Sequence, residues 1–403
     1  MSAQDTEQDN KQKTAIYADN AATTPVSESV LSAMLPFFRE NWGNPSGLYR
    51  KGREARASLE SARERIASLL GVLPSEVFFT SGGSEGDNWA IRGTALAARR
   101  RDPGKNHIIT SKIEHPAVLN TCRALENEGF DVTYLDVDGE GFVSPAALSA
   151  AITRRTLLAS VMLANNEIGT LEPVAELASA AHERGVPFFT DAVQAAGAVP
   201  LDVGVLGVDM LSLSGHKFHA PKGVGILYVK NGTSLDRLVC GGRQERGMRA
   251  GTENVAYAVG LSAALEEAVS GLSRMGELSE MRDSLLDKLL LIPGSRLNGP
   301  REKRLPGNIN ISFDGVEGES LCLLLDMEGV AISTGSACSA GSVEISHVLT
   351  AIGLDEATAR GAVRISLSTE NTPEEAERIA SAVALSVGRI RELSRASDIS
   401  EEE

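Results

Sequence analysis

Strand-like and helical segments alternate along residues 77–229, and this alternation limits the fold more than any single motif. The apolar, β-rich runs are at residues 107–110, 157–163 and 186–191, and the helical stretches are at residues 84–100, 116–128 and 174–184. Parallel strands need long crossover connections, usually helices, so the pattern predicts a mostly parallel sheet with helices on both faces.

The remainder of the chain predicts a second, smaller unit. After about residue 272, helices are mixed with strand-like runs at residues 308–313, 330–333 and 363–368. A chain of 403 residues with 42% hydrophobic content can form a large domain and a smaller one. We therefore expect an α/β protein with two lobes.

Lys217 lies on a Ser-Gly-His turn between the strand-like runs 209–214 and 224–229. A lysine between two buried strands is poorly placed for a solvated charge. Desolvation lowers the pKa of its ammonium group, and the neutral amine can then form a Schiff base with a carbonyl. The alternative is a lysine at a strand end that points into water, and this window leaves both interpretations open.

A Schiff base with pyridoxal phosphate also needs a carboxylate near the ring nitrogen. Asp191 ends the buried run 186–191, and ligands of open α/β sheets bind at the carboxyl ends of strands. Gln194 follows three residues later and could reach the phenolic oxygen of the ring. The commoner role for a residue such as Asp191 is a helix N-cap.

The same cofactor needs a phosphate cradle and a group stacked on its ring. Gly83 lies in a glycine turn, where Ser84 is expected to cap a helix whose amides would face a phosphate. His115 lies at a strand-to-helix junction, where its ring could stack on a cofactor, and Asn166 offers a further polar contact. Most glycine–serine turns are only turns, and His115 could instead be satisfied by backbone bonds.

Taken in order, these motifs resemble the cysteine desulfurases, in the nitrogen-fixation and housekeeping branch of the class V aminotransferase-like pyridoxal-phosphate enzymes. The resemblance runs from Tyr17 to about Thr372. Its motifs are Asp19-Asn-Ala-Ala-Thr-Thr-Pro25, Gly43-Asn-Pro-Ser46, Thr110-Ser-Lys-Ile-Glu-His115, Ser214-Gly-His-Lys217 and Gly241-Gly-Arg-Gln-Glu-Arg-Gly-Met-Arg-Ala-Gly-Thr-Glu-Asn254. It implies fold type I, with a mostly parallel seven-stranded sheet in the large domain and a smaller α/β domain.

The resemblance also implies a division of the chain. The expected units are a flexible tail (1–13), a segment packed with the small domain (14–24), a large cofactor-binding domain (25–267), a small domain (268–393) and an acidic tail (394–403).

By the same resemblance, Lys217 carries pyridoxal 5'-phosphate, and His115 belongs to the catalytic residues. Ser214 and His216 would bind the cofactor phosphate, together with Gly83 and Ser84. Thr252 would reach the phosphate of a partner subunit, which implies a homodimer. The sequence departs from the family at Tyr49, where a histidine is usual, and this departure concerns the rim of the site.

Cys338 lies in a segment of small and hydroxylic residues, 332–342. Such a segment cannot pack a core, so we expect a mobile, exposed loop with an accessible thiol. An incidental loop thiol is the alternative. Cys122 and Cys322 lie in expected helices, with Cys322 expected in the core, and Cys240 precedes a glycine pair. No Cys-x-x-Cys pair occurs, which argues against a metal site or a disulfide framework.

The chemistry implied by the resemblance combines these residues. L-cysteine would give up its sulfur to Cys338 as a persulfide, alanine would leave, and the persulfide would pass to an acceptor such as an iron–sulfur scaffold protein. Lys217 would move protons, and Arg364 with Asn166 would hold the substrate, with a bidentate grip of Arg364 on its carboxylate. Otherwise Arg364 is a surface arginine on an edge strand. No metal of its own is expected, although the persulfide could contact a nascent cluster on the scaffold.

Other functions fit less well. Selenocysteine lyase or another pyridoxal-phosphate lyase or aminotransferase is the alternative, but a transaminase needs no thiol such as Cys338. A catalytically silent scaffold would not need Lys217 and Asp191. A nicotinamide enzyme lacks support because no Gly-x-Gly-x-x-Gly follows the first strand, and Phe218 stands where a P-loop needs Ser or Thr.

Charge and hydropathy bear on partners and location. The net charge of −15 argues against tight binding to nucleic acid. We expect no membrane span, since no apolar run approaches roughly 18 residues, and no signal peptide, since the first residues lack an apolar core. Together with unpaired cysteines, this indicates a reducing cytoplasm.

Overall fold

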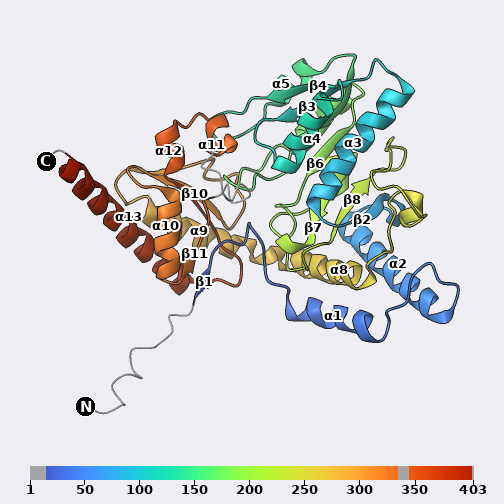
Figure 1. Ribbon diagram of the computed structural model, residues 1–403, viewed down its shortest axis with the longest axis horizontal. Coiled ribbons are helices and arrows are strands. Elements are labelled where there is room, and N and C mark those ends of the chain that lie inside the picture. Colours follow the sequence, from blue (N-terminus) through green and yellow to red (C-terminus); the bar gives the residue numbers. More distant parts are fainter. Residues whose placement is uncertain (1–14, 335–344, 402–403) are drawn as a thin grey trace, which may run out of the picture.

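The computed structural model describes residues 15–334 and 345–401, with side chains to residue 395. Figure 1 shows two lobes, each built around its own sheet. The larger lobe holds most of the first 270 residues, and the smaller lobe holds the C-terminal part of the chain.

The large lobe contains a seven-stranded sheet in the order β2-β8-β7-β6-β5-β3-β4. Its strands are β2 (Val77–Thr80), β3 (His107–Ser111), β4 (Asp131–Leu135), β5 (Thr156–Ser160), β6 (Phe188–Asp191), β7 (Met210–Ser214) and β8 (Gly225–Val229). Only β8 runs antiparallel to its neighbours within this sheet, which confirms the mostly parallel prediction. The run predicted to continue to Leu163 ends earlier, because β5 stops at Ser160.

Helices cover both faces of this sheet. They are α1 (Glu28–Arg39), α2 (Arg50–Leu70), α3 (Gly83–Arg101), α4 (Pro116–Glu126), α5 (Pro145–Ala151), α6 (Val174–His182), α7 (Val203–Leu206) and α8 (Val255–Ser270). Successive strand residues enter opposite cores: Ile109 and Phe188 belong to one apolar cluster, whereas Ile108 and Phe189 belong to another. This alternation is the side-chain period of a strand buried on both faces.

The small lobe has a three-stranded antiparallel sheet in the order β12-β10-β9, where β9 is Ser295–Leu297, β10 is Asn308–Phe313 and β12 is Ala362–Ser366. Its helices are α9 (Met275–Leu289), α10 (Gly318–Met327), α11 (His347–Ala351), α12 (Glu356–Arg360) and α13 (Pro373–Glu401). Apolar residues from α9, α10 and α13 pack with those of β10 and β12. The predicted second α/β lobe is present.

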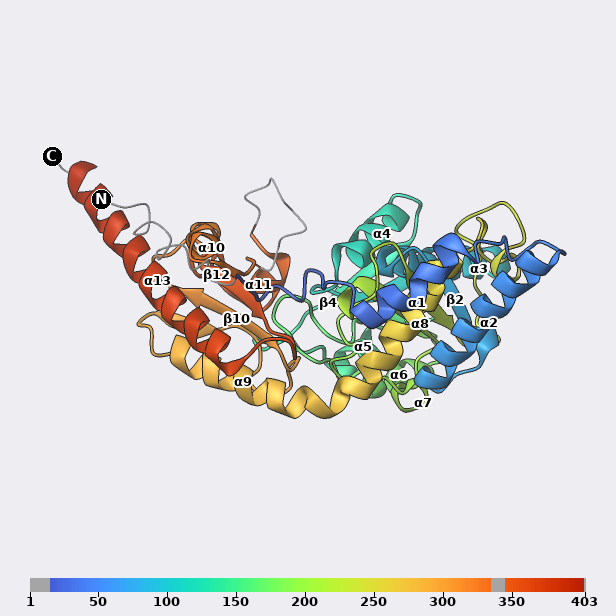
Figure 2. The same ribbon diagram turned by 90° about the horizontal axis from the view of Figure 1, so that it is seen from below.

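Two segments connect the lobes. The first is a nearly continuous helical run of α8, a short 3-10 turn (Gly271–Arg274) and α9, which Figure 2 shows passing along one side of both lobes. The second is the N-terminal segment, in which β1 (Ile16–Tyr17) pairs with β11 (Val330–Ala331) of the small lobe, and the Thr24 amide then donates to His216 O in the large lobe.

The run Val255–Leu289 differs from the expectation that no apolar stretch approaches membrane-spanning length. Among the described residues it is the one helical run long and apolar enough to cross a bilayer, and 44% of its most apolar window is buried. Ala258 and Leu261 lie in the large-lobe core, and α8 packs against α1 and α2. Burial within the protein accounts for the apolar composition.

Candidate active site

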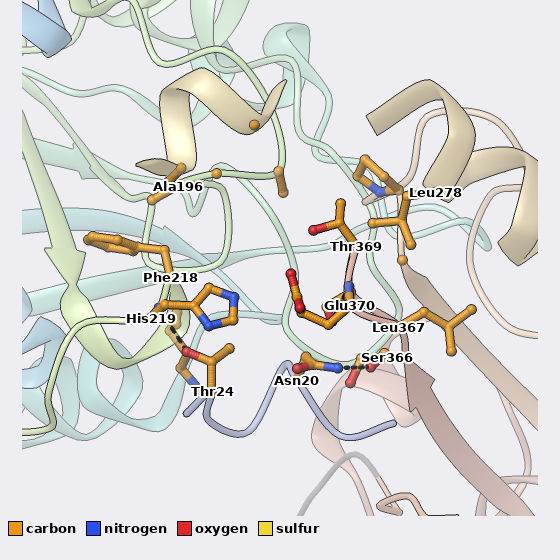
Figure 3. Close-up of a pocket in the computed structure, with 18 of the residues that line it drawn as sticks. Asn20, Thr24, Ala196, Phe218, His219, Leu278, Ser366, Leu367, Thr369 and Glu370 are labelled. Carbon is orange, nitrogen blue, oxygen red and sulfur yellow. Dashed lines mark hydrogen bonds between the residues drawn. The ribbon is translucent and has the colours of Figure 1, made fainter. Parts of the chain in front are cut away.

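Several of the predicted site residues lie at the carboxyl ends of β6 and β7, on the side of the large lobe that meets the small lobe. Asp191 is the last residue of β6, and Lys217 ends the 3-10 turn that follows β7. A cavity of about 550 Å³ adjoins Lys217. Figure 3 shows Thr24, Phe218 and His219 of the large-lobe side facing Leu367, Thr369 and Glu370 of the small lobe across it.

Lys217 points towards the N-terminal segment rather than into bulk water. Its Nζ donates to Ala21 O at 2.6 Å and to Ala22 O at 2.8 Å. Gln194 Nε2 donates to the same Ala21 carbonyl at 3.0 Å. The structure therefore brings Lys217 and Gln194 together, although they are 23 positions apart in the chain.

Behind Lys217 lies a cluster of acidic groups and a histidine. Asp87, His115 and Asp191 each offer a ligand atom, and these atoms all lie within 4.8 Å of one another. Burial raises the pKa of Asp191, while His115 and Lys217 act in the opposite direction. Burial, reinforced by Asp191, raises the pKa of Asp87 well above its usual range.

Sequence reasoning missed Asp87. It lies on α3, is 1% exposed, and accepts a 2.5 Å hydrogen bond from Ser212 Oγ of β7. The only signal in the sequence is an acidic residue one turn after the glycine pair, on a helix expected to pack on the sheet.

His115 is the N-cap of α4, and its Nδ1 accepts a hydrogen bond from the Ala117 amide at 3.1 Å. The neutral ring therefore carries its proton on Nε2. Burial lowers the pKa of His115, which favours this neutral form. The backbone bond and a stacking role are compatible, because the cap uses an edge of the ring and not its face.

The turn predicted to cradle a phosphate does begin a helix, α3, but Ser84 is not the cap of that helix. Gly82 is the N-cap of α3, with a φ of +152° that favours glycine, and Ser84 lies inside the first turn. A Cβ at Gly83 would come within 2.6 Å of Val193 Cγ2, so this turn needs glycine. A Cβ at Gly82 would lie 3.5 Å from Ser214 Oγ, which places Ser214 beside the turn.

His216 and Thr252 lie further out. His216 Nδ1 is 3.1 Å from Thr23 Oγ1, and burial, aided by the charge of Lys217, lowers the pKa of His216 to about 4. Thr252 is exposed on the surface of the large lobe.

Arg364 lies on β12, an edge strand, yet its side chain is only 3% exposed, so the surface interpretation is wrong. Its Nη1 donates to Asn166 O at 2.8 Å, and its Nη2 donates to Asp19 Oδ1 at 2.7 Å. Within the described residues its buried Nε has no hydrogen-bond partner. Arg364 and the Asn166 carbonyl therefore meet across the lobe boundary, and the Nε–H of Arg364 has no partner among the described residues.

Cys338 lies outside the described residues. The chain approaches it from beside the site, because Ser333 and Arg364 exchange backbone hydrogen bonds of 3.2 and 2.6 Å. Burial raises the pKa of the Cys122 and Cys322 thiols to about 12, which makes both poor nucleophiles. Cys322, predicted in the core, packs against the core of the small lobe while half-buried, and Cys240 is exposed.

Residues 16–379 match the family described as aminotransferase class-V. The chain belongs to this family. This member is 50% identical over 381 residues to "Cysteine desulfurase IscS" of Methanosarcina thermophila, with 94% of each chain covered. It is also 50% identical over 389 residues to the protein of the same description from Clostridium botulinum strain Hall, with 96% of each covered.

Solved structures agree with this family assignment. A "NifS-like protein" superposes with a TM-score of 0.85 at 39% identity, covering 94% of this family member and 99% of that chain. "SspA in complex with cysteine" superposes with a TM-score of 0.77 at 40% identity, covering 87% and 98%. The recognised family and the fold type are therefore confirmed.

Proposed function

We propose that this protein is a cysteine desulfurase, which converts L-cysteine to L-alanine and transfers the sulfur to Cys338. The observation that carries the proposal is that Lys217 of the large lobe and Arg364 of the small lobe both bond to residues 19–22 of the N-terminal segment. Buried Asp191 lies near enough to Lys217 for their charges to interact, and the buried Nε of Arg364 has no partner among the described residues. Relatives at about 50% identity with the name cysteine desulfurase support it.

The residues fit pyridoxal 5'-phosphate, the cofactor of the family. Buried Asp191 would hold the ring nitrogen, and Gln194 the ring oxygen, with His115 stacked on the ring. The N-terminus of α3 with Ser84, together with Ser214 and His216, would hold the phosphate, and Gly83 leaves room where a Cβ would clash. Asp87, His115 and Asp191 could ligate a metal by spacing alone, but a nearby lysine and a glycine-rich helix N-terminus favour the phosphorylated cofactor.

When bound, this cofactor supplies an electron-withdrawing ring that stabilises negative charge developing on the substrate. Asp191 would keep the ring nitrogen protonated, since a carboxylate favours the charged form of a group beside it. Lys217, which the Ala21 and Ala22 carbonyls hold at the site, would take and return protons at the α-carbon of the substrate.

Arg364 would bind the substrate carboxylate, and Asn166 would contact it from the opposite lobe. The Nε of Arg364 and a neighbouring terminal nitrogen form a planar pair suited to two parallel hydrogen bonds. The Cys338 thiolate would then attack the substrate sulfur. The carbon–sulfur bond breaks, a sulfur–sulfur bond forms on Cys338, and alanine leaves after gaining a proton.

We further propose a homodimer in the cytoplasm. Large apolar side chains are exposed along α1 and after it, including Phe38 at 53%, Trp42 at 66% and Leu48 at 90% exposed. Exposed large apolar side chains gathered on one stretch of chain are typical of an interface between protein chains. Thr252 would cross this interface to the partner's cofactor phosphate. The Cys338 persulfide would pass to an acceptor, which we propose is an iron–sulfur scaffold protein.

The test is the alanine and sulfide released from L-cysteine by the purified protein with a reductant. Both should form in equal amounts, and Cys338→Ala should lose them while keeping the yellow cofactor band. Cys240→Ser is the matched control, because its thiol is exposed and lies outside the site. No alanine from protein that shows the band would refute the assignment and direct attention to another amino acid, such as selenocysteine.

A further inference from the structure

Residues 241–254, here named the clamp loop, lie between β8 and α8 at the edge of the large sheet (Figure 1). Two successive non-glycine residues in this loop have positive φ angles, Glu245 at 45° and Arg246 at 56°. Residues with side chains rarely adopt such angles because they are strained, so strong contacts must hold the loop in this conformation.

The first contact is a buried ion pair with α2. Glu245 accepts hydrogen bonds of 2.8 Å from both terminal nitrogens of Arg63, and both side chains are 2% exposed. Glu245 also accepts from the Phe79 amide at 3.0 Å, and Arg246 donates to Val77 O at 2.8 Å. Because β2 is an edge strand, these bonds also satisfy backbone groups that no neighbouring strand can reach.

The second contact joins the clamp loop to the expected phosphate cradle. Arg249 donates through Nε and Nη2 to the two carboxylate oxygens of Glu85, at 2.8 and 3.0 Å. Glu85 lies in the first turn of α3 and accepts from the Ser81 amide at 2.7 Å. A bidentate pair restricts orientation as well as distance, so the loop and the turn before α3 form one rigid unit.

Thr252 follows Arg249 by three residues and is exposed. We propose that Arg249 and Glu245 are positioning residues, which hold Thr252 where the phosphate of the partner's cofactor requires it. The inference rests on the proposed dimeric pyridoxal-phosphate enzyme. Its consequence is that the Arg249–Glu85 pair acts on two sites. It holds the phosphate cradle of its own subunit, and it positions Thr252 for the cofactor phosphate of the neighbouring subunit.

A purely local role for the two ion pairs makes a different prediction. If they only stabilise the sheet edge and the start of α3, their loss affects the subunit that carries the substitution. If they position Thr252, their loss weakens cofactor binding in the other subunit. The two roles are therefore separated by an effect measured across the dimer interface.

The experiment uses mixed dimers from two differently tagged chains. One subunit carries Lys217→Ala, which removes its own yellow cofactor band, together with a second substitution. The other subunit is wild type, so the band reports only the wild-type site. The second substitutions are Arg249→Gln, Thr252→Ala and, as a matched control from the same loop, Arg243→Gln, whose side chain is exposed.

Arg249→Gln and Thr252→Ala should each raise the cofactor dissociation constant of the wild-type subunit about tenfold, as expected for a weakened hydrogen bond to a charged phosphate. Arg243→Gln should leave it unchanged. Glu85→Arg and Arg249→Glu, combined in the Lys217→Ala subunit, rebuild the ion pair with its charges reversed. This combination should recover part of the cofactor affinity of the wild-type subunit, whereas a general loss of folding would not be recovered.

Two results would overturn the inference, and they differ in meaning. An effect of Thr252→Ala without one of Arg249→Gln would show that Thr252 needs no clamp, and the proposed function would stand. No effect of either substitution across the interface would remove the role of Thr252 in the partner's site, and with it the dimeric part of the proposed function.

Discussion

Arg63 and Arg364 are both buried arginines, with 2% and 3% exposed side chains, but their surroundings differ. Arg63 lies under the clamp loop, donates to both oxygens of Glu245 and to Val77 O, and reaches Glu60 through Nε. Arg364 lies between the lobes, donates to Asp19 and Asn166, and keeps a buried Nε without a partner among the described residues.

Buried carboxyl groups show the same contrast. Glu245 accepts from three donors, whereas Glu114, next to His115, has one buried oxygen without a partner among the described residues. Burial raises the pKa of Glu114 to about 8. Natural proteins pair almost all buried polar atoms, so the exceptions mark places where a ligand or a proton is handled. The saturated pair of Arg63 and Glu245 therefore indicates a structural role, and the unpartnered Nε of Arg364 indicates a place for a ligand.

The strongest test of this contrast is Arg364→Gln. Losing two charged hydrogen bonds to a substrate carboxylate should lower kcat/KM for L-cysteine roughly 10²- to 10⁴-fold. The control is Arg360→Gln, since Arg360 is 40% exposed and pairs with Glu356 in the same lobe. Steady-state kinetics measures kcat/KM, and the intensity of the cofactor band measures how much of the protein is folded. An activity loss fully explained by less folded protein would make Arg364 structural, like Arg63.

The next test is Arg63→Met, which should act on stability. Removing one partner of a buried ion pair leaves Glu245 uncompensated and should cost about 3–5 kcal/mol in the free energy of unfolding. Urea denaturation at one protein concentration measures this, with Arg65→Met as control, because Arg65 forms an exposed pair with Glu266 and should cost less than about 1 kcal/mol. Equal losses of unfolding free energy in the two variants would mean that the hydrogen bonds of buried Arg63 contribute little to stability.

The smallest effect, taken per unit of pH, concerns Glu114. Its folded pKa of about 8 lies above the ordinary value of 4.5, so the folded state holds a proton that the unfolded state releases. Its contribution to stability is present below pH 4.5 and is lost as the pH rises towards 8, by at most about 1.4 kcal/mol per pH unit. In Glu114→Gln the urea midpoint should fall less steeply as the pH rises. Glu176→Gln, a substitution of an exposed residue, should leave the slope unchanged. An unchanged slope in Glu114→Gln would show that Glu114 is ionised in the folded protein.

Much of the large lobe could be predicted because strand periodicity and glycine turns are local signals. Asp191 at the end of β6 and Lys217 after β7 follow from those signals alone. The position of Ser84 was predicted wrongly because Gly82 or Ser84 could each begin the helix, and the conformation at Gly82 decided it. Nothing in the sequence indicates that β5 ends at Ser160, because the apolar residues 161–163 are buried although they lie outside the strand.

The remaining site features depend on partners far apart in the chain. Arg63 and Glu245 are 182 positions apart, and Arg364 and Asp19 are 345 apart. Nothing in the sequence around Arg364 distinguishes a buried arginine from a surface one. Asp87 likewise becomes notable only because β6 brings Asp191 beside α3.

The N-terminal segment has a consequence for the order of events during synthesis. Ala21 and Ala22 leave the ribosome early, but Lys217, which they contact, emerges almost 200 residues later, and Ser366, which holds Asn20 and Ala21, emerges later still. The contacts of the segment are complete only when nearly all of the chain exists. The reactive lysine is therefore enclosed only after both lobes have been made, and an incomplete chain cannot assemble a working pocket.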